Sequence, residues 1–464
     1  MSAQGDVTVG IDIGTTSVKA VAVNGAGDVL ARARVPHLML SPTAGAFEHR
    51  IETAWQTNVY EALSHVANGL DVAAVNVSAM VPSLGALTDE GKACSPGLLY
   101  GDYRGITDTN KPNDPGDAGE LLAFLSWLTK NSPEAVHFWP AQAVANHALC
   151  GAGSIESITA MSAFPLYNGR HWDDEKLREV GVPPESLPNV VRGTQPIGEV
   201  RSDIAARGAL VGGGTIDAFG EQIVAGADNE GDVLVICGAT LITWAVANSD
   251  NGSPDGSGIW SIPHTATGKL LLGGPSNAGG IFVDRAHQWL GISPAEPVDD
   301  IRLDDIPIWL PYVRGERSPI HRRNLRAELR DLAIHHQTAH LRRAIYEASG
   351  FVVRHHLDLA MRRGAEPKRL VVTGGGSRSQ AWLQALADCT GLPVDVVNTP
   401  EGAALGSAFI ARCVAGLEDN ILEARRWAKS PRRVDPDSRW QEPVQARYLR
   451  FLQLTNEAVR NSSG

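Results

Sequence analysis

The chain of 464 residues carries 41 basic and 52 acidic side chains, which gives a formal net charge of −11 at pH 7. One hydrophobic core rarely supports this length, so we expect two or three domains. The acidic balance argues against nucleic acid as the main partner, and an anionic substrate would need a local basic patch or a metal ion to offset it.

Cysteine usage and apolar runs indicate a cytoplasmic protein. The five cysteines are scattered, odd in number and free of any C-x-x-C pair, which favours reduced thiols. No basic-then-apolar leader precedes the first apolar run, so we expect no secretory signal. The longest apolar run, Val233 to Ala247, is interrupted by Gly238 and Thr240 and predicts a buried hairpin rather than a membrane span.

The first strong pattern is a strand, a tight turn and a second strand. Apolar residues alternate over 7–13, and another such run follows at 18–23, as expected for strands. The small residues of 14–17 offer hydroxyls and backbone N–H groups, which suit phosphate oxygens. Asp12 lies close to this turn, and a carboxylate there suits hydrated Mg²⁺. The alternative is a turn that only reverses the chain, but strands rarely carry a carboxylate without a partner.

A helix, a buried strand and a candidate ligand-binding loop are expected next. The apolar stripe over 51–67 predicts the helix, and 71–78 is typical of a strand in a parallel sheet. The loop at 79–83 follows the carboxyl end of that strand, where open α/β sheets bind ligands. Residues 105–210 are expected to be mostly helical, as an insertion that builds one wall of a cleft.

Candidate polar residues appear at two further places. Tyr100, Asp102 and Arg104 stand within five residues, although a surface salt bridge is the favoured interpretation of Asp102 with Arg104 taken alone. A short strand and a glycine run at 211–214 lead to Asp217 at the first turn of a helix. The alternative for Asp217 is an ordinary helix N-terminal residue stabilised by the helix dipole.

The opening strand–turn–strand pattern recurs in the second half of the chain. Residues 233–246 have the pattern of a strand, a small-residue turn with Gly238 and Thr240, and a second strand. Two such hairpins suggest two similar domains that face each other across a cleft. We place the boundary near residue 226.

Two βα units in the second half could bind an anion. Residues 277–280 precede a predicted helix, and glycines 374–376 lie between a buried strand at 369–373 and another helix. Helix N-termini of this kind present N–H donors, although a glycine loop alone is weak support. The other expected elements are strands at 308–313 and 393–397, a close-packing helix of small residues beginning at 400–406, and a peripheral helix plus tail from about 418.

Histidines at five positions could suggest a metal site. They are His335, His336, His340, His355 and His356. The carboxylate–histidine spacing of a zinc site does not accompany them, so structural roles are the favoured interpretation.

Five motifs together resemble the FGGY family of carbohydrate kinases, within the actin-like ATPase superfamily, over nearly the whole chain. The motifs are Asp12–Lys19, Gly213–Asp217, Asn277–Gly280, Leu310–Pro319 and Gly374–Trp382. The resemblance implies an α/β protein of two actin-like (ribonuclease H-like) domains with mixed sheets flanked by helices, and with nucleotide and sugar in the interdomain cleft. We expect an N-terminal sugar-binding domain over 1–226 and a C-terminal nucleotide-binding domain over 227–464.

The resemblance also implies roles for single residues. Asp217 would be the catalytic base and, with Asp12, a ligand of Mg²⁺. The residues expected to bind ATP are Thr15, Thr16, Lys19, Gly238, Thr240, Gly279, Gly375 and Ser379, with the two threonines at the terminal phosphates. The residues expected near the sugar are Met80, Val81, Tyr100, Asp102, Arg104 and Ala218. The carboxyl groups of Asp12 and Asp217 should then line opposite sides of one crevice between the domains.

The sequence departs from the family pattern around the sugar. Xylulose kinases of this family show Gln-Met-His-Gly where this chain looks to have Met80-Val-Pro-Ser83, and the usual Trp-Asn-Asp-x-Arg appears as Tyr100-Gly-Asp-Tyr-Arg104. Ala218 stands where an amide side chain is common, and the second turn reads Gly-Ala-Thr rather than Gly-Thr-Ser. We therefore expect a less polar sugar pocket, so the family does not specify the sugar.

These features predict an ATP- and Mg²⁺-dependent kinase that phosphorylates a hydroxyl of a small ketose, polyol or sugar acid, with homodimer formation left open. A second hypothesis is a catalytically weak or inactive relative that senses a sugar or nucleotide, which the altered 80–83 loop motivates. A third, an actin- or chaperone-like ATPase, would turn over ATP without sugar and leaves a carboxylate at the sugar end unexplained.

Overall fold

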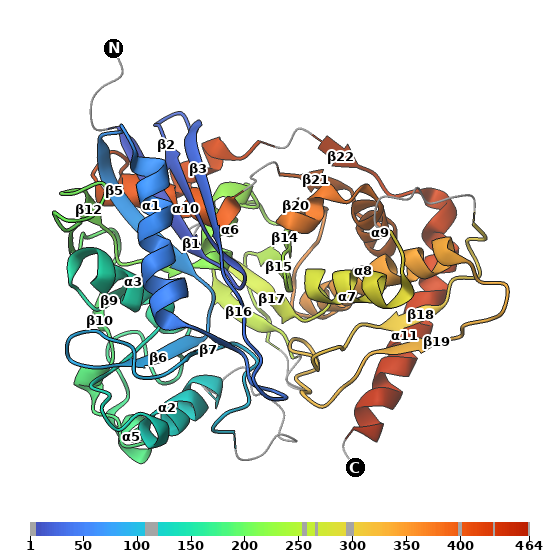
Figure 1. Cartoon of the computed structure of the whole chain (residues 1–464). Helices are drawn as coiled ribbons and strands as arrows, with labels where there is room; N and C mark the ends of the chain where they lie inside the picture. The colour runs from blue at the N-terminus through green and yellow to red at the C-terminus, as the bar shows by residue number, and fades with distance from the viewer. Residues whose placement is uncertain are drawn as a thin grey trace. The chain divides into compact units, whose positions relative to one another are not determined.

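A computed structural model describes residues 6–106, 119–252, 258–264, 268–293, 301–397, 401–429 and 432–462 (Figure 1). The described chain forms two compact units. The first takes in the residues up to 224 together with 401–427, and the second takes in the remainder. Residues 401–427, which the sequence-based division assigned to the second half, therefore pack with the first unit. The expected border at residue 226 stays a prediction.

The first unit is built on a mixed sheet with three antiparallel strands at one side. Its strands are β1 (Val7–Ile13), β2 (Ser17–Val23), β3 (Val29–Pro36), β5 (Val72–Ala79), β11 (Gly198–Glu199), β12 (Leu210–Val211) and β13 (Thr215–Ile216). Their order is β11-β12-β5-β1-β2-β3, with β13 also paired to β5. β1 runs antiparallel to β2 and parallel to β5, and β12 and β13 are parallel to β5. The predicted opening hairpin and the buried strand after it are confirmed.

Helices and short strands surround this sheet. The helices are α1 (Asn58–Ala67), preceded by a π-helical segment (Glu52–Thr57), α2 (Gly119–Asn131), α3 (Ala141–Cys150), α4 (Ser157–Met161), α5 (Asp174–Glu179), α6 (Asp217–Ala225) and α10 (Gly402–Val414). The short strands are β4 (Glu48–His49), β6 (Ser83–Leu87), β7 (Gly97–Leu99), β8 (His137–Trp139), β9 (Ser154–Glu156) and β10 (Asn189–Val191). The segment expected to be mostly helical thus alternates helices with short strands, apart from residues 107–118, which lie outside the described residues.

The second unit repeats the arrangement of the first sheet. Its sheet consists of β14 (Asp232–Cys237), β15 (Leu241–Ala247), β16 (Trp260–Pro263), β17 (Leu270–Ser276), β20 (Arg369–Thr373), β21 (Val394–Val396) and β22 (Arg432–Val434). The order is β16-β17-β15-β14-β20-β21-β22. As in the first unit, the hairpin strand β14 is antiparallel to the next strand and parallel to a later one, β20. The prediction of two similar domains is confirmed.

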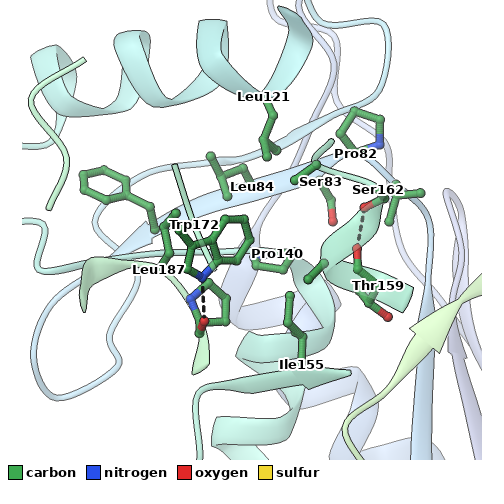
Figure 2. A pocket seen from close by; sticks show the side chains of 15 residues that line it. Pro82, Ser83, Leu84, Leu121, Pro140, Ile155, Thr159, Ser162, Trp172 and Leu187 are labelled. Carbon is green, nitrogen blue, oxygen red and sulfur yellow. Dashed lines mark hydrogen bonds between the residues drawn. The ribbon is translucent and has the colours of Figure 1, made fainter. Parts of the chain in front are cut away.

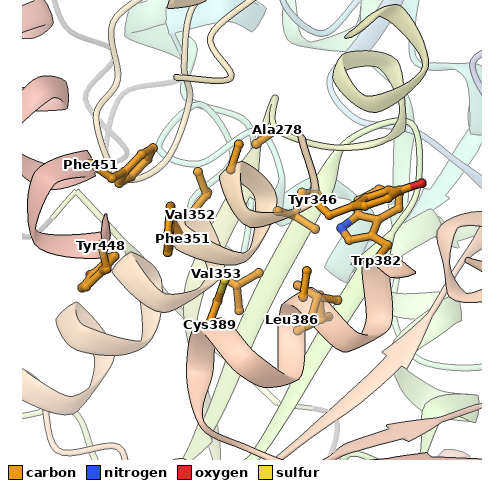
Figure 3. Close-up of a cluster of buried hydrophobic side chains, with 14 of the residues drawn as sticks. Ala278, Tyr346, Phe351, Val352, Val353, Trp382, Leu386, Cys389, Tyr448 and Phe451 are labelled. Carbon is orange, nitrogen blue, oxygen red and sulfur yellow. The ribbon is translucent and has the colours of Figure 1, made fainter. Parts of the chain in front are cut away.

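The helices of the second unit enclose a large aromatic core (Figure 3). They are α7 (Gly280–Leu290), α8 (Thr338–Arg362), α9 (Gln380–Thr390) and α11 (Gln441–Asn461), and a short hairpin is formed by β18 (Ile308–Leu310) and β19 (Glu328–Arg330). Phe351 of α8 packs against Tyr448 and Phe451 of α11. Arg447 of α11 also donates two hydrogen bonds to the buried carboxylate of Glu347 on α8, at 2.7 and 2.8 Å.

These contacts correct the prediction of a peripheral C-terminal helix plus tail. Tyr448 and Phe451 are buried, so α11 is an integral part of the core of the second unit. The high charge of the segment suggested a solvated helix, but part of that charge forms a buried ion pair with α8. Among the described residues, no helix is long and apolar enough to span a membrane.

Helix α10 packs closely on the sheet, as the run of small residues predicted, and it packs closely on α6 as well. A Cβ added to Gly10 of β1 would lie 1.8 Å from the carbonyl oxygen of Ala404, and one added to Gly406 would lie 1.9 Å from that of Gly220 on α6. Thr8 Oγ1 of β1 donates to the carbonyl of Ala408 at 2.9 Å. The helix begins at Gly402, and residue 400 lies outside the described residues.

This close packing predicts that Gly10→Ala destabilises the protein by about 2–4 kcal/mol, because the new methyl group meets backbone atoms that cannot rotate away. Gly151→Ala is the matched control. Gly151 has φ 80° and nothing within 4 Å of an added Cβ, so only the left-handed backbone is penalised, by about 1–2 kcal/mol. Urea denaturation of both variants measures the difference. Equal losses would contradict the close-packing argument.

Candidate active site

Two carboxylates, those of Asp12 and Asp217, lie where strands β1 and β13 of the first sheet end. Strand β5 lies between β1 and β13, and its residue Ser78 is opposite Asp12 on one side and Thr215 on the other. Neighbouring strands lie about 4.8 Å apart, so the backbones at 12 and 215 are ~10 Å apart. Asp217 follows two residues later, at the start of α6. Both carboxylates belong to the first unit, so the expectation that they face each other across an interdomain crevice is wrong.

Asp12 is a buried carboxylate with incomplete compensation. It is 5% exposed; Ser78 Oγ donates to its Oδ1 at 3.2 Å, and Lys19 Nζ lies 3.8 Å from its Oδ2. Burial raises the pKa of Asp12, while Lys19 and Ser78 act in the opposite direction. The charge of the Asp12 carboxylate is thus balanced only in part, by Lys19. A buried carboxylate oxygen of this kind is a suitable ligand for a hard divalent cation such as Mg²⁺. Lys19, expected at the nucleotide, is thus the ion-pair partner of Asp12.

Asp217 is half-buried at the N-terminus of α6. Its Oδ1 accepts the backbone N–H of Ala218 at 2.7 Å, and the helix dipole stabilises a negative charge at this end. The carboxylate is therefore held in a fixed direction, as a proton acceptor requires. Ala218 is half-buried beside it.

Two buried amide side chains fix the strand ends next to these carboxylates, and sequence reasoning missed both. Gln142 of α3 donates through Nε2 to the carbonyls of Ala79 and Thr215, at 3.0 and 3.1 Å. Asn76 of β5 accepts the N–H of Gly214 at 3.0 Å. Asn76 could have been noticed as a polar residue within an apolar strand, whereas the position of Gln142 depends on the packing of α3.

The first turn presents hydroxyls as expected. Thr16 is exposed, and Thr15 is half-buried. The hydroxyl of Thr15 lies 3.0 Å from that of Tyr100, which is itself buried. A residue expected near the sugar thereby contacts a residue expected at the phosphates. A tryptophan at position 100, as in the family pattern, has no hydroxyl to form this hydrogen bond.

The loop expected to contact the sugar borders a small apolar cavity (Figure 2). Met80 is buried, Val81 and Pro82 line the cavity, and its volume is about 30 Å³. This holds roughly one water molecule rather than a sugar. The hydroxyl of Ser83 accepts the N–H of Ala141 at 3.2 Å, so the loop faces the cavity mainly with apolar groups.

Asp102, Arg104 and Glu48 form a partly buried cluster of charged side chains. Asp102 is 0% exposed and accepts the N–H of Phe47 at 2.7 Å. Arg104 donates to both Asp102 oxygens and, at 2.6 Å, to Glu48. Its guanidinium also lies over the Trp127 ring. The ion pair foreseen as the alternative is present but partly buried, and a substrate role for either residue stays a prediction.

The second unit holds its own turn against a helix N-terminus. The N–H of Gly280 donates to the carbonyl of Gly238 at 2.8 Å, and that of Ile281 donates to Ala239 at 3.1 Å. A Cβ on Gly279 would lie 2.2 Å from the carbonyl carbon of Thr240. The turn at 238–240 and the segment around Gly279, both predicted to bind nucleotide, are thus in direct contact.

Glu316 holds the segment that precedes Gly279 through hydrogen bonds to its side chain. It is buried and accepts the N–H groups of Asn277 and Arg317 and the hydroxyl of Ser276, at 2.9, 2.7 and 2.8 Å. Burial raises its pKa to about 7, although these donors lower it. Glu316 was part of a family motif, but the sequence alone gave it no role.

The third predicted nucleotide segment follows β20. Gly374 adopts φ 87°, a backbone conformation that favours glycine. Gly375 is exposed, and Ser379 caps α9 by accepting the N–H of Trp382 at 3.3 Å. The expected loop and helix N-terminus are therefore present.

The second unit also contains a histidine cluster. Within the described residues, Asp305, His335 and His336 form a group with metal-compatible spacing. However, His336 Nδ1 accepts the N–H of Ala333 at 2.8 Å, which places the ring proton on Nε2, the atom facing Asp305 at 3.1 Å. A metal would need a lone pair there, so the geometry favours a hydrogen-bonded structural cluster. His356 is buried and hydrogen-bonded to the carbonyl of Val352.

Comparison with known proteins identifies a family. Residues 7–111 match the N-terminal domain of the FGGY family of carbohydrate kinases, and residues 294–415 match its C-terminal domain. Xylulose kinase from Streptomyces coelicolor is 29% identical over 92% of each chain, and a probable L-xylulose kinase from Pasteurella multocida is 25% identical over 96% of this chain and 98% of its own. The crystal structure of gluconate kinase from Lactobacillus acidophilus superposes with a TM-score of 0.83, at 21% identity over 98% of each chain.

The two family domains occur in the expected order, the relatives match almost end to end, and the fold has two actin-like domains. The chain belongs to the FGGY family and is a carbohydrate kinase.

Proposed function

We propose that this protein transfers the terminal phosphoryl group of ATP to a hydroxyl of a small ketose, polyol or sugar acid, with Asp217 as the general base. The observation that carries the proposal is the register of β1, β5 and β13. It brings Asp12, the first turn and Asp217 to one edge of one sheet. Each of the three groups suits a different part of a phosphoryl transfer.

A sugar hydroxyl is a weak nucleophile, so a carboxylate must orient it and accept its proton as the phosphoryl group transfers. Asp217 suits this role because α6 and the N–H of Ala218 fix its direction. Asp12, together with Asp217, would hold Mg²⁺, which when bound offsets charge on the phosphoryl oxygens. Thr15 and Thr16 would bind the terminal phosphates through the turn.

The nucleotide would also contact the second unit. Gly238, Thr240 and Gly279 lie in one contiguous set of turns, and Gly375 and Ser379 lie at another helix N-terminus. Such termini favour anionic groups. We propose these five residues as the remaining nucleotide ligands.

The acceptor is expected to be a sugar with an apolar part or fewer hydroxyls near loop 80–83. The relatives named above act, by their names, on xylulose, L-xylulose or gluconate. Val81 and Pro82 supply only apolar groups to the cavity beside the loop. Met80, Tyr100 and Ala218 would complete the sugar side.

A sugar or nucleotide sensor of low activity is the competing function, because loop 80–83 and the Gly-Ala-Thr turn depart from the family pattern. The enzyme is favoured because the chain has both Asp12 and Asp217, and hydrogen bonds from Ser78 and from the N–H of Ala218 orient their carboxylates. ATP consumption measured across a panel of ketoses, polyols and sugar acids separates the two. Turnover with one compound supports the kinase; nucleotide binding without turnover on any compound supports the sensor.

Asp217→Asn is expected to fold, to bind nucleotide and to lose at least ~10²-fold in kcat, because general-base catalysis typically contributes that much. Asp437→Asn is the matched control, since Asp437 also caps the start of a helical turn, in the second unit. A coupled ADP-release assay compares both variants with the wild type. Near-normal turnover by Asp217→Asn would refute the assignment of the base.

Asp12→Asn is expected to raise the Mg²⁺ concentration needed for half-maximal rate by ~10-fold or more, because a neutral amide is a poor ligand for a hard cation. Titration of the rate with Mg²⁺ at saturating substrates measures it. An unchanged Mg²⁺ requirement would place the metal elsewhere.

The same substitution should stabilise the protein without ligands at pH 8. Since burial raises the pKa of Asp12, the folded state binds its proton more tightly than the unfolded state, and stability falls as pH rises above the ordinary carboxyl range. The amide has no charge to bury. We therefore expect the Tm of Asp12→Asn to exceed that of the wild type at pH 8 and to approach it near pH 4. The opposite pH trend would contradict this.

A further inference from the structure

Three carbonyl groups of the first turn, those of Gly14, Thr15 and Thr16, accept hydrogen bonds from donors elsewhere in the first unit. Gly14 O accepts from His37 Nε2 at 3.0 Å, and Thr15 O accepts from His49 Nε2 at 2.9 Å. Thr16 O accepts from the backbone N–H of His37 at 3.0 Å. The two imidazole rings contact each other edge to face, with centroids 4.5 Å apart. The turn is therefore tied to a pair of histidines.

The protonation of both rings follows from their second contacts. Trp55 Nε1 donates to His49 Nδ1 at 3.1 Å, and Asn58 Nδ2 donates to His37 Nδ1 at 3.5 Å. A ring nitrogen that accepts a hydrogen bond carries no proton, so each Nε2 must carry one and donate to the turn. Burial lowers the pKa of both histidines, that of His49 to about 4. Both rings are thus neutral donors at physiological pH.

These tethers determine where the N–H groups of the turn point. In a trans peptide, the carbonyl of one residue and the N–H of the next lie in one plane and point in opposite directions. Fixing Gly14 O therefore fixes the N–H of Thr15, and fixing Thr15 O fixes the N–H of Thr16. Within the described part of the chain, neither N–H donates to a backbone carbonyl. Both remain available to a ligand.

The second unit tethers its own turn at the same two positions by different means. The carbonyls of Gly238 and Ala239 accept the backbone N–H groups of Gly280 and Ile281. Side chains hold one turn, and a helix N-terminus holds the other. The shared result is a turn whose carbonyls are tied down and whose next N–H groups are oriented. This recurrence indicates that the orientation itself matters.

We propose that His37 and His49 are positioning residues for phosphate, which orient the N–H groups of Thr15 and Thr16 toward the terminal phosphates of the nucleotide. This inference rests on the proposed function, because it assumes that the first turn binds those phosphates. It adds two residues that contact neither phosphate nor sugar. Loss of either histidine is therefore expected to lower the affinity for a nucleotide that carries the terminal phosphates, and not the affinity for one that lacks them.

Isothermal titration with MgATP and with AMP tests the inference, because AMP lacks the terminal phosphates. His49→Leu removes the donor and is expected to weaken MgATP binding by ~10-fold, about the effect of one hydrogen bond, while changing the affinity for AMP less than ~2-fold. His49→Gln keeps an N–H donor on a side chain of similar reach and should recover most of the loss. A general loss of packing would weaken both ligands and would not be rescued by Gln.

His264→Leu is the matched control. His264 is also buried and donates through Nε2 to a backbone carbonyl, that of Ala227, in the second unit. It should bind MgATP as the wild type does. If His49→Leu does not fold, Trp55→Phe provides a second route, because His49 Nδ1 then loses its donor and the ring proton is no longer confined to Nε2. A smaller loss, again selective for MgATP, is expected.

Two results would overturn the inference while the proposed function stands: wild-type MgATP affinity in His49→Leu, or equal losses for MgATP and AMP. The same holds for Trp55→Phe if it is the variant used. A wild-type protein that binds neither MgATP nor AMP would instead refute the proposed function, and the inference with it.

Discussion

The close approach of α10 to β1 and α6 is the contact on which the candidate site depends. Glycines at positions 10, 220 and 406 leave no side chains between the backbones, so the helix lies directly on both elements. β1 carries Asp12 near its end, and α6 begins with Asp217. One helix, from a segment almost 400 residues after the first strand, therefore supports both carboxylates. Close-packed interiors transmit small displacements, so a shift of α10 would move both groups.

Buried polar residues on β5 form hydrogen bonds both to α10 and to Asp12 of the candidate site. Asn76 and Ser78 are two residues apart and therefore project from the same face of the strand. Asn76 donates to Ser407 of α10 at 2.9 Å, and Ser78 donates to Asp12. Unpaired, these groups would each be costly to bury, so the pairing selects one register among β1, β5 and α10. The run of apolar residues predicts a buried strand here. The polar residues within it, Asn76 and Ser78, determine which elements pack beside the strand.

Local patterns were sufficient to predict the hairpins, the buried strands and the glycine loop after β20, because strand period and turn chemistry depend on adjacent residues. They could not place Asp217 relative to Asp12, since that depends on β13 pairing with β5. Nor could they show that α11 is core, because its arginine pairs with Glu347 a hundred residues earlier. The two histidines that contact the first turn were missed for the same reason: their partners, Gly14 and Thr15, are distant in sequence.

The charge of the chain bears on how the first turn could bind a phosphate group. The protein carries a net charge of −11, and Lys19 is engaged with the Asp12 carboxylate. A phosphate group at the first turn would then depend on backbone N–H dipoles and a divalent cation, and not on a lysine that contacts it directly, as in a P-loop. Dipoles that are already oriented attract an anion without first having to reorganise. In the proposed kinase, the fixed carbonyls of the turn would supply that orientation before the nucleotide binds.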